Sequence, residues 1–320
     1  MRSFKDRLLL GLKGMAMGAA DVVPGVSGGT IAFITGIYHE LINTLGNLGF
    51  NAIQVLFKGQ FKAFWKAVNG GFILPLVIGI AVSILSLARL LSRGLEEEPI
   101  AVWSFFFGLV AASIPIVARQ VNTWRAQCYF AFGVGAIAAF LITELPVVDN
   151  PEASWYLFLS GAIAICAMIL PGISGSFILL LMGSYLAVLD AINDRDLVAI
   201  AVFGSGAVVG LLSFSKVLQW MFKRYHDVTV ALLSGFLLGS LNKIWPWKKP
   251  LETITKYPGE EKEKVVVLED ENLFPWNFAE QMGEEPQVTI ALGMALFGVF
   301  LIFGIDRLAH VLRGKASGKA

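Results

Sequence analysis

The stretch Pro24-Gly25-Val26-Ser27-Gly28-Gly29-Thr30 decides the fold, because it interrupts an apolar segment that runs from Leu8 to Leu45. A proline and three glycines within six residues end a helix. Each apolar arm beside this break has roughly 15 residues, fewer than the about 20 that a helix needs to cross a bilayer. The pattern therefore predicts a re-entrant helical hairpin over residues 8–45, which enters and leaves the membrane on one side. One long bent helix is the alternative.

The same kind of break occurs a second time in the chain. Pro171-Gly172-Ile173-Ser174-Gly175-Ser176 interrupts the apolar segment 155–192, at an offset of 147 residues (171 minus 24) from the first break. Two further matches at this offset pair Gly36 with Gly183 and Tyr38 with Tyr185. The chain therefore predicts a second re-entrant hairpin over residues 155–192.

Six conventional apolar segments accompany the two breaks. They cover residues 72–91, 100–118, 126–145, 197–222, 228–245 and 288–305, and each is long enough for a membrane-spanning helix. The composition agrees, since 56% of the residues are hydrophobic, 15% are charged and the mean hydropathy is +0.69. A soluble domain could not cover so much apolar surface with polar groups. The sequence predicts an all-α integral membrane protein.

The matches between the halves continue through the spans. An offset of 127 residues (206 minus 79) pairs Gly79 with Gly206 and Gly108 with Gly235. Each half thus contains one hairpin and three spans, and because three is odd, the second half is inverted in the membrane relative to the first. Inverted repeats with broken helices at the repeat interface are the architecture of secondary transporters. The predicted fold is therefore an inverted repeat.

The predicted organisation has two repeats and a tail. The first repeat, residues 1–145, contains the hairpin 8–45, an amphipathic insertion at 46–68 and the spans of 72–145. The second repeat, residues 146–310, contains the hairpin 155–192, three spans and an external loop at 246–287. Within this loop, residues 256–271 form a charged excursion with at most one short strand, at 265–268. Residues 311–320 form a cytoplasmic tail.

Charged residues in the connections predict the orientation. Basic clusters at Lys58–Lys66, Arg119–Arg125 and Lys223–Arg224 fall on the side of the N-terminus when both hairpins return to their own side, and the connections that are poor in Lys and Arg fall opposite. Enrichment in Lys and Arg marks the cytoplasmic side. The N- and C-termini are therefore predicted to be cytoplasmic, in a bacterial plasma membrane.

The two breaks predict an anion-binding site. A helix that begins after each break presents N–H groups without intrahelical partners and a positive partial charge, which bind phosphate or carboxylate. Glycines let a ligand approach the backbone, and hydroxyls donate or cap the helix. The predicted phosphate-binding residues are Gly25, Ser27, Gly28, Gly29, Thr30, Gly172, Ser174, Gly175 and Ser176. Close packing of small residues between helices is the alternative.

Three charged residues inside apolar segments extend this hypothesis. Arg89 and Lys216 match at the 127-residue offset, and we expect them to bind a phosphate at the two ends of its path; snorkelling toward the headgroups is the alternative. Asp21 precedes the first break, and Met168 replaces it in the second half. This asymmetry suggests a site for a coupling ion, either a proton or sodium, whereas pairing with Lys13 or an arginine is the alternative.

Other chemistry finds little support in the sequence. The cysteines Cys128 and Cys166 lie in apolar runs and suggest small buried hydrophobic residues, and the three histidines are scattered. We therefore expect no metal site and no cofactor. A net charge of +1 gives no field for nucleic acid, and no cluster suited to acid–base or nucleophilic catalysis is present.

The segment from Lys13 to Thr30, followed by Gly36-Ile37-Tyr38, closely resembles the bacterial polyprenyl-phosphate (undecaprenyl-phosphate) transporter family, formerly a domain of unknown function. Leu170–Ser176 also fits, and the resemblance extends to about residue 310 with the loop 246–287 unmatched. It implies that undecaprenyl phosphate returns from the outer to the inner leaflet, with the matched breaks as its site.

The leading hypothesis is a transporter of a lipid monophosphate that works by ion-coupled alternating access, because the chain has no nucleotide-binding motif. A carrier of a small soluble anion is the first alternative. A membrane enzyme acting on a lipid phosphate is the second. Membrane lipid is the expected surrounding, whereas the coupling ion, a homo-oligomeric state and the lipid tail-length preference are left open.

Overall fold

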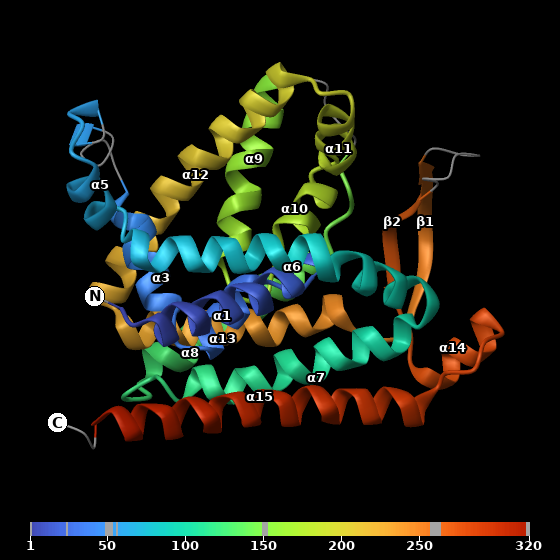
Figure 1. Cartoon of the computed structure of the whole chain (residues 1–320). Coiled ribbons are helices and arrows are strands. Elements are labelled where there is room, and N and C mark those ends of the chain that lie inside the picture. Colours follow the sequence, from blue (N-terminus) through green and yellow to red (C-terminus); the bar gives the residue numbers. More distant parts are fainter. Residues whose placement is uncertain are drawn as a thin grey trace.

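The computed structural model describes residues 2–23, 25–48, 54–55, 57–148, 153–256 and 264–317, and this part of the chain is mostly helical (Figure 1). Pro24 of the first break lies outside it, as do residues 49–53 and 56 of the amphipathic insertion and residues 257–263 of the external loop. The helices of the first half are α1 (Phe4–Val22), α2 (Gly28–Ile34), α3 (Tyr38–Asn47), α5 (Phe61–Ala67), α6 (Gly70–Glu97), α7 (Pro99–Ala118) and α8 (Ala126–Thr143). The elements of the second half are α9 (Ser154–Ile169), α10 (Gly175–Leu181), α11 (Tyr185–Asn193), α12 (Leu197–Arg224), α13 (His226–Ser240), the 3-10 helix η1 (Leu241–Ile244), β1 (Lys248–Lys256), β2 (Lys264–Asn272), α14 (Pro275–Met282) and α15 (Val288–Ser317).

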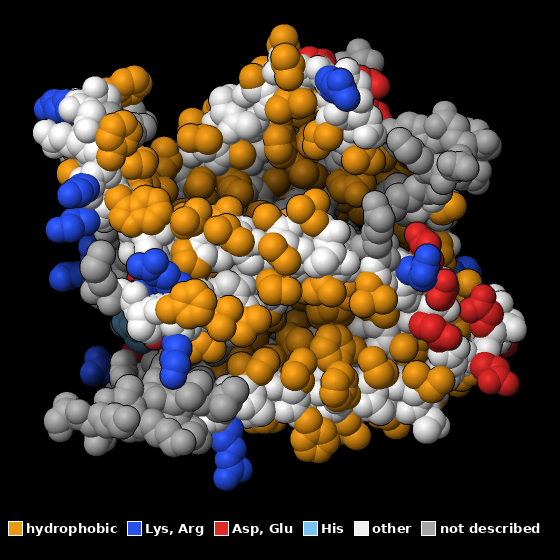
Figure 2. All heavy atoms as spheres, in the orientation of Figure 1, with side chains coloured by type: hydrophobic (Ala, Val, Ile, Leu, Met, Phe, Trp, Pro, Cys, Tyr) orange, Lys and Arg blue, Asp and Glu red, His pale blue; other side chains and the backbone are white. Residues whose placement is uncertain are grey.

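Six helices in the described ranges are long and apolar enough to cross a membrane, namely α6, α7, α8, α12, α13 with η1, and α15. Their outward faces carry large hydrophobic side chains, such as Leu85 and Phe130, which are 82% and 76% exposed. Figure 2 shows hydrophobic side chains over the middle of the molecule, Lys and Arg along its left edge and Asp and Glu at its right edge. Soluble monomeric proteins rarely expose an apolar surface of this extent to water. The predicted all-α integral membrane protein with six conventional spans is confirmed.

Glycines set the packing of two corresponding helix pairs, α1 with α6 and α9 with α12. A Cβ at Gly79 would lie 2.0 Å from the carbonyl oxygen of Gly11, and a Cβ at Gly206 would lie 1.9 Å from that of Phe158. Only a residue without a side chain lets these backbones approach so closely. Since Gly11 and Phe158 are 147 residues apart and Gly79 and Gly206 are 127 apart, the two halves make this contact with the residues that the sequence matched.

The remaining spans pack across the two halves. The last helix of each half lies against the middle span of the other, α15 against α7 and α8 against α13. The contacts again use matched glycines, because a Cβ at Gly108 would lie 2.0 Å from the Ala295 carbonyl oxygen and one at Gly235 would lie 2.0 Å from that of Phe132. In Figure 1, α1, α6, α7, α13 and α15 run in roughly the same direction, whereas α9 and α12 are steeply inclined to them. The halves are therefore interleaved and do not form separate bundles.

Each predicted hairpin contains three helices where the sequence predicted two arms. The second arm of the first hairpin is divided into α2 and α3 near Gly36, and that of the second hairpin into α10 and α11 near Gly183. These glycines have φ values of +71° and +65°, the left-handed conformation that ends a helix at little cost only for glycine. The axes of α10 and α11 differ in direction by 109°. The sequence matched Gly36 with Gly183 without showing that they end these short helices.

The loop 246–287, which was predicted to be external, contains more regular structure than the sequence predicted. Instead of one short strand at 265–268, β1 and β2 pair over nine residues each as an antiparallel hairpin, from Lys248 opposite Asn272 to Lys256 opposite Lys264. A β-branched stretch of each strand pairs with that of the other, Thr253–Thr255 on β1 opposite Val265–Val267 on β2, and such residues favour extended backbone. The last span also differs, because α15 continues to Ser317 through most of the predicted tail.

Candidate functional site

The two breaks meet inside the protein. The backbone N–H of Gly25 donates to the Ser174 hydroxyl at 3.0 Å, and the backbone N–H of Gly172 donates to the Thr30 hydroxyl at 2.9 Å. Thr30 is fully buried and Ser174 is 2% exposed. Each glycine amide thus finds its partner on the opposite break, so that the junction of the two breaks is a direct hydrogen-bonded contact.

Ser27 fastens the first break to the second from the other direction. Its hydroxyl donates to the carbonyl oxygen of Leu170 at 2.9 Å and accepts the N–H of Gly29 at 3.0 Å. The side chain is completely buried. Ser27 therefore caps α2 and holds the end of α9 with one oxygen, which leaves it no direct access to a ligand in this conformation.

Two charged residues of α1 lie at the two ends of α2. The Asp21 carboxylate accepts the N–H of Gly28 at 2.7 Å at the beginning of α2, and the Lys13 ammonium donates to the carbonyl oxygen of Thr35 at 2.7 Å at its end. An anion at the N-terminus and a cation at the C-terminus both stabilise a helix. Asp21 therefore has a structural partner at the junction, in addition to its predicted role with a coupling ion.

The beginning of α10 is less completely paired than that of α2. Ser174 accepts the N–H of Phe177 at 3.2 Å, and its hydroxyl lies 3.3 Å from that of Ser176. Gly175 and Ser176 are half-buried, and their N–H groups make no hydrogen bond within the ranges that the structure describes. Of the predicted anion-binding groups, these two amides and the Ser176 hydroxyl are the most available.

The end of α13 and η1 cover the junction. A Cβ at Gly172 would lie 2.7 Å from the Ser240 hydroxyl oxygen, and a Cβ at Gly25 would lie 3.0 Å from Cγ of Lys243. Both glycines have positive φ, +97° and +82°, so a side chain at either position would meet strain as well as a neighbour. The two turns of the breaks are therefore packed directly beneath this segment.

Lys243 brings a cation to the junction. Its ammonium group lies 4.9 Å from the ring centroid of Phe177, whose N–H is bonded to Ser174. Lys243 was not among the predicted site residues, although it stands inside the predicted span 228–245, where a charge is costly and suggests a function. That position was the available signal.

Lys243 belongs to a buried ionic cluster with Lys248 and Asp270. The Asp270 carboxylate accepts from the Lys243 ammonium at 2.9 Å and from the Lys248 ammonium at 2.8 Å. The lysine side chains are each 12% exposed and that of Asp270 is 18% exposed. Burial lowers the pKa of Lys248, while the nearby Asp270 carboxylate opposes this shift. Burial acts to raise the pKa of Asp270, but the ammonium groups of Lys248 and Lys243 hold it below its usual value.

Of the two predicted cations, only the side chain of Lys216 is described, and it lies outside the junction. Lys216 lies on α12 with an exposed side chain, six residues beyond Gly210, whose carbonyl oxygen is 3.7 Å from Sγ of Cys166 on α9. It is therefore less than two turns along α12 from a contact with the second hairpin. The backbone of Arg89 lies in α6, and its side chain is outside the described residues.

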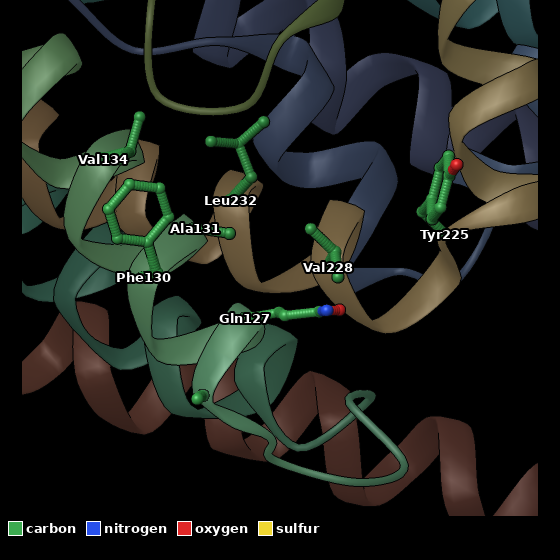
Figure 3. Close-up of a pocket in the computed structure, with 8 residues that line it drawn as sticks. Gln127, Phe130, Ala131, Val134, Tyr225, Val228 and Leu232 are labelled. Atoms are coloured by element: carbon green, nitrogen blue, oxygen red, sulfur yellow. The ribbon is translucent and has the colours of Figure 1, made fainter.

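An apolar cavity of about 630 Å³ opens between α8 and the joint of α12 and α13 (Figure 3). Its lining comprises Ala126, Gln127, Phe130, Ala131, Val134, Tyr225, Val228 and Leu232. None of these residues belongs to the junction, and none carries a charge. A phosphate group would find no cation there, whereas a hydrocarbon chain would be compatible with such walls.

Six spans and two broken apolar segments that meet inside the molecule define a multi-pass membrane protein of the kind found among transporters. A sequence model of the family described as "VCA0040-like: Undecaprenyl phosphate translocase-like" matches residues 17–262, and the chain belongs to this family.

Two relatives extend this finding. The chain is 44% identical over 299 residues to a protein of Vibrio cholerae serotype O1 named polyprenyl-phosphate transporter, which covers 93% of this chain and 96% of that protein. It is 32% identical over 254 residues to a Staphylococcus aureus protein of the same name, covering 73% of this chain and 85% of that protein. Both are named as transporters, which agrees with the prediction that the chain is not an enzyme. The resemblance seen in the sequence is confirmed, and no solved structure matches the chain.

Proposed function

We propose that this protein moves a polyprenyl phosphate, such as undecaprenyl phosphate, from the outer to the inner leaflet of a bacterial plasma membrane. The junction of the two breaks supports this most directly, because it places backbone amides and hydroxyls beside the Lys243 cation within an apolar body. A bare phosphate in hydrocarbon is very costly unless such groups replace its water. The names of the two relatives support the same substrate.

The proposed site has an open part and a closed part. The amides of Gly175 and Ser176 and the Ser176 hydroxyl are available to a headgroup at once. Gly25, Ser27, Gly28, Gly29, Thr30, Gly172 and Ser174 would join them only after the two breaks separate. A headgroup that replaces the contacts between the breaks would couple its binding to a change of conformation. Lys216 and Arg89 remain proposed contacts along the path.

Alternating access is the proposed mechanism, and the corresponding contacts of the two halves support it. The matched pairs Gly79–Gly11 and Gly206–Phe158 give each half a similar rigid unit of one hairpin arm and one span. If the second half is inverted, as the odd number of spans predicts, exchange of their two arrangements would open the junction to opposite sides. We propose that Asp21 carries the coupling proton or sodium ion, since the second half has Met168 in its place.

We further propose that both termini face the cytoplasm. The basic connections support this orientation. Figure 2 shows Lys and Arg along the left edge of the molecule and mainly Asp and Glu, with a few basic groups, at the right edge. The acidic end carries the β1–β2 hairpin and α14, which would then face the outside (Figure 1).

Reconstitution in liposomes tests the proposed function. Purified protein is inserted in vesicles that contain undecaprenyl phosphate, and a membrane-impermeant phosphatase reports the fraction of lipid phosphate in the outer leaflet, with and without a proton or sodium gradient. We expect the protein to speed the exchange between leaflets, and one gradient to bias it. An unchanged leaflet distribution would refute the proposal, whereas uptake of soluble phosphate or release of phosphate without added phosphatase would favour an anion carrier or an enzyme.

A further inference from the structure

The ionic cluster of Lys243, Lys248 and Asp270 joins two lysines that are five residues apart to an aspartate from the far strand of the hairpin. Lys243 comes from η1, Lys248 from the first residue of β1 and Asp270 from β2. Two neighbouring asparagines, Asn272 and Asn242, extend it. Lys248 also donates to the Asn272 side-chain oxygen at 3.1 Å, and the Asn272 amide donates to the backbone oxygen of Asn242 at 2.8 Å. The hairpin is thus fastened to the segment that covers the junction.

The charges in this cluster do not balance. Two ammonium groups share one carboxylate, and all three side chains are largely buried. A further acid, the exposed Glu144, accepts a hydrogen bond from Asn242 and attracts Lys248 from outside the hydrogen-bonded group. A phosphate monoester carries about −1.5 to −2 charges at neutral pH, so it would neutralise two lysines more completely than one carboxylate does.

The position of the cluster links it to the junction. The Lys243 ammonium lies over the ring of Phe177, the third residue of α10, and Lys243 also packs against Gly25. The half-buried amides of Gly175 and Ser176 begin the same helix. A phosphate bound between the two lysines would therefore lie near the Phe177 ring, on the helix whose first two amides have no hydrogen-bond partner among the described residues.

We propose that Lys243 and Lys248 form an entry subsite for the phosphate of the substrate, and that the Asp270 carboxylate occupies it until the phosphate displaces it. The proposal rests on the function proposed above. Displacement of Asp270 removes its ion pair with Lys243 and leaves the Asn272–Asn242 hydrogen bonds as contacts between β2 and η1. The segment over Gly25 and Gly172 is thereby held less firmly. Binding of the phosphate and loosening of the segment over the junction then occur together. Until the phosphate binds, the Asp270 carboxylate keeps more weakly binding anions out of the subsite.

Binding of farnesyl phosphate to the detergent-solubilised full chain tests this inference by calorimetry at fixed salt. We expect Asp270→Asn to bind the ligand about tenfold more tightly than wild type, the equivalent of one charge-assisted hydrogen bond. The matched control Glu269→Gln, an exposed neighbour on β2, should bind as wild type does. Inorganic phosphate distinguishes a lipid headgroup from a free ion, because we expect the larger gain for farnesyl phosphate.

A second variant controls for misfolding as the cause of any change in binding. Lys243→Gln combined with Asp270→Asn leaves the net charge of the cluster unchanged, and its elution and melting are compared with wild type. We expect it to lose the gain in affinity of Asp270→Asn. The inference would be overturned if Asp270→Asn bound farnesyl phosphate no more tightly than wild type, or if the double variant kept the full gain in affinity. Either result would leave the proposed transport function of the wild type intact. If wild type neither bound nor moved the lipid, the proposed function itself would fail.

Discussion

The backbone N–H of Gly25 and the hydroxyl of Ser174 lie 3.0 Å apart, although 149 residues of sequence separate them. This bond joins Gly25, where the first break turns with a positive φ, to Ser174, which caps α10 in the second break. It also uses groups that a headgroup would need. The described conformation is therefore one in which the breaks bind each other, and a bound phosphate would have to compete with that contact.

Replacing Ser174 with alanine should destabilise the protein by about 1–3 kcal/mol, because the buried N–H groups of Gly25 and Phe177 would lose their acceptor. Thermal unfolding in detergent measures the effect. Ser176→Ala is the matched control, since Ser176 is half-buried and, among the described residues, its hydroxyl has one hydrogen-bond neighbour, the Ser174 hydroxyl at 3.3 Å. A Ser174→Ala variant that melts at the wild-type temperature would contradict the described junction.

Gly28→Ala should also destabilise the protein. An added Cβ would lie 2.5 Å from Oδ2 of Asp21, so the carboxylate must move away from the helix end that it caps. Such overpacking typically costs about 1–3 kcal/mol. The control is Gly133→Ala in α8, where a Cβ meets nothing within 4 Å.

The pairing of Gly28 with Asp21 can be tested by a double-mutant cycle of thermal stabilities. Asp21→Ala removes the side chain that the new methyl group meets, so we expect the two changes to cost less together than the sum of their separate effects. Strict additivity would show that the loss in Gly28→Ala arises elsewhere.

The spans and the positions of the two breaks were predictable, because both follow from local properties, whereas the meeting of the breaks was expected from the repeat of the pattern in the two halves. Hydropathy over about 20 residues identifies a span, and the Pro-Gly-Ser pattern identifies a break from its own residues. The matched offsets then predicted which glycines correspond, and Gly79 and Gly206 make corresponding contacts. Positions of this kind require no knowledge of distant neighbours.

The pairing of individual groups was not predictable in the same way. The sequence suggested that Ser27 and Thr30 would be donors for a ligand, but their partners are Leu170 and Gly172, more than 140 residues away. Asp270 lies in a charged stretch that resembles a solvated loop, and only pairing of β2 with β1 brings it to Lys243. The partners of these side chains are set by contacts between distant segments, which cannot be deduced from a single sequence.

Asp21→Asn should keep the hydrogen bond that caps α2 but remove the negative charge that is proposed to carry the coupling ion. The amide oxygen can still accept the N–H of Gly28, so we expect melting within about 1 kcal/mol of wild type. If Asp21 carries the coupling ion, lipid transfer in liposomes should proceed at the same rate with and without the effective gradient. Glu284→Gln, an exposed acid outside the spans, should keep the dependence. A gradient response like that of wild type would remove Asp21 from the coupling role.

Lys216→Ala should slow lipid transfer without changing stability. The side chain is exposed on α12, and substitutions at such positions usually change stability by less than about 0.5 kcal/mol. Loss of one cation from the path of a phosphate should lower the rate on the order of tenfold. Lys223→Ala, at the basic end of the same helix, is the control. Transfer at the wild-type rate in Lys216→Ala would place this lysine at the headgroups and away from the substrate.

Acid should release the β1–β2 hairpin only at low pH. The ammonium groups of Lys248 and Lys243 hold the pKa of Asp270 below its usual value of 3.8 against the opposing effect of burial. A carboxyl with a depressed folded-state pKa stabilises the fold fully above its unfolded-state pKa, and this contribution is lost as pH falls through the folded-state pKa. We therefore expect the difference in melting temperature between wild type and Asp270→Asn to stay constant from about pH 7 to pH 5 and to shrink only below 3.8. A difference that disappeared already near neutral pH would mean that the two lysines do not hold Asp270 in its charged form.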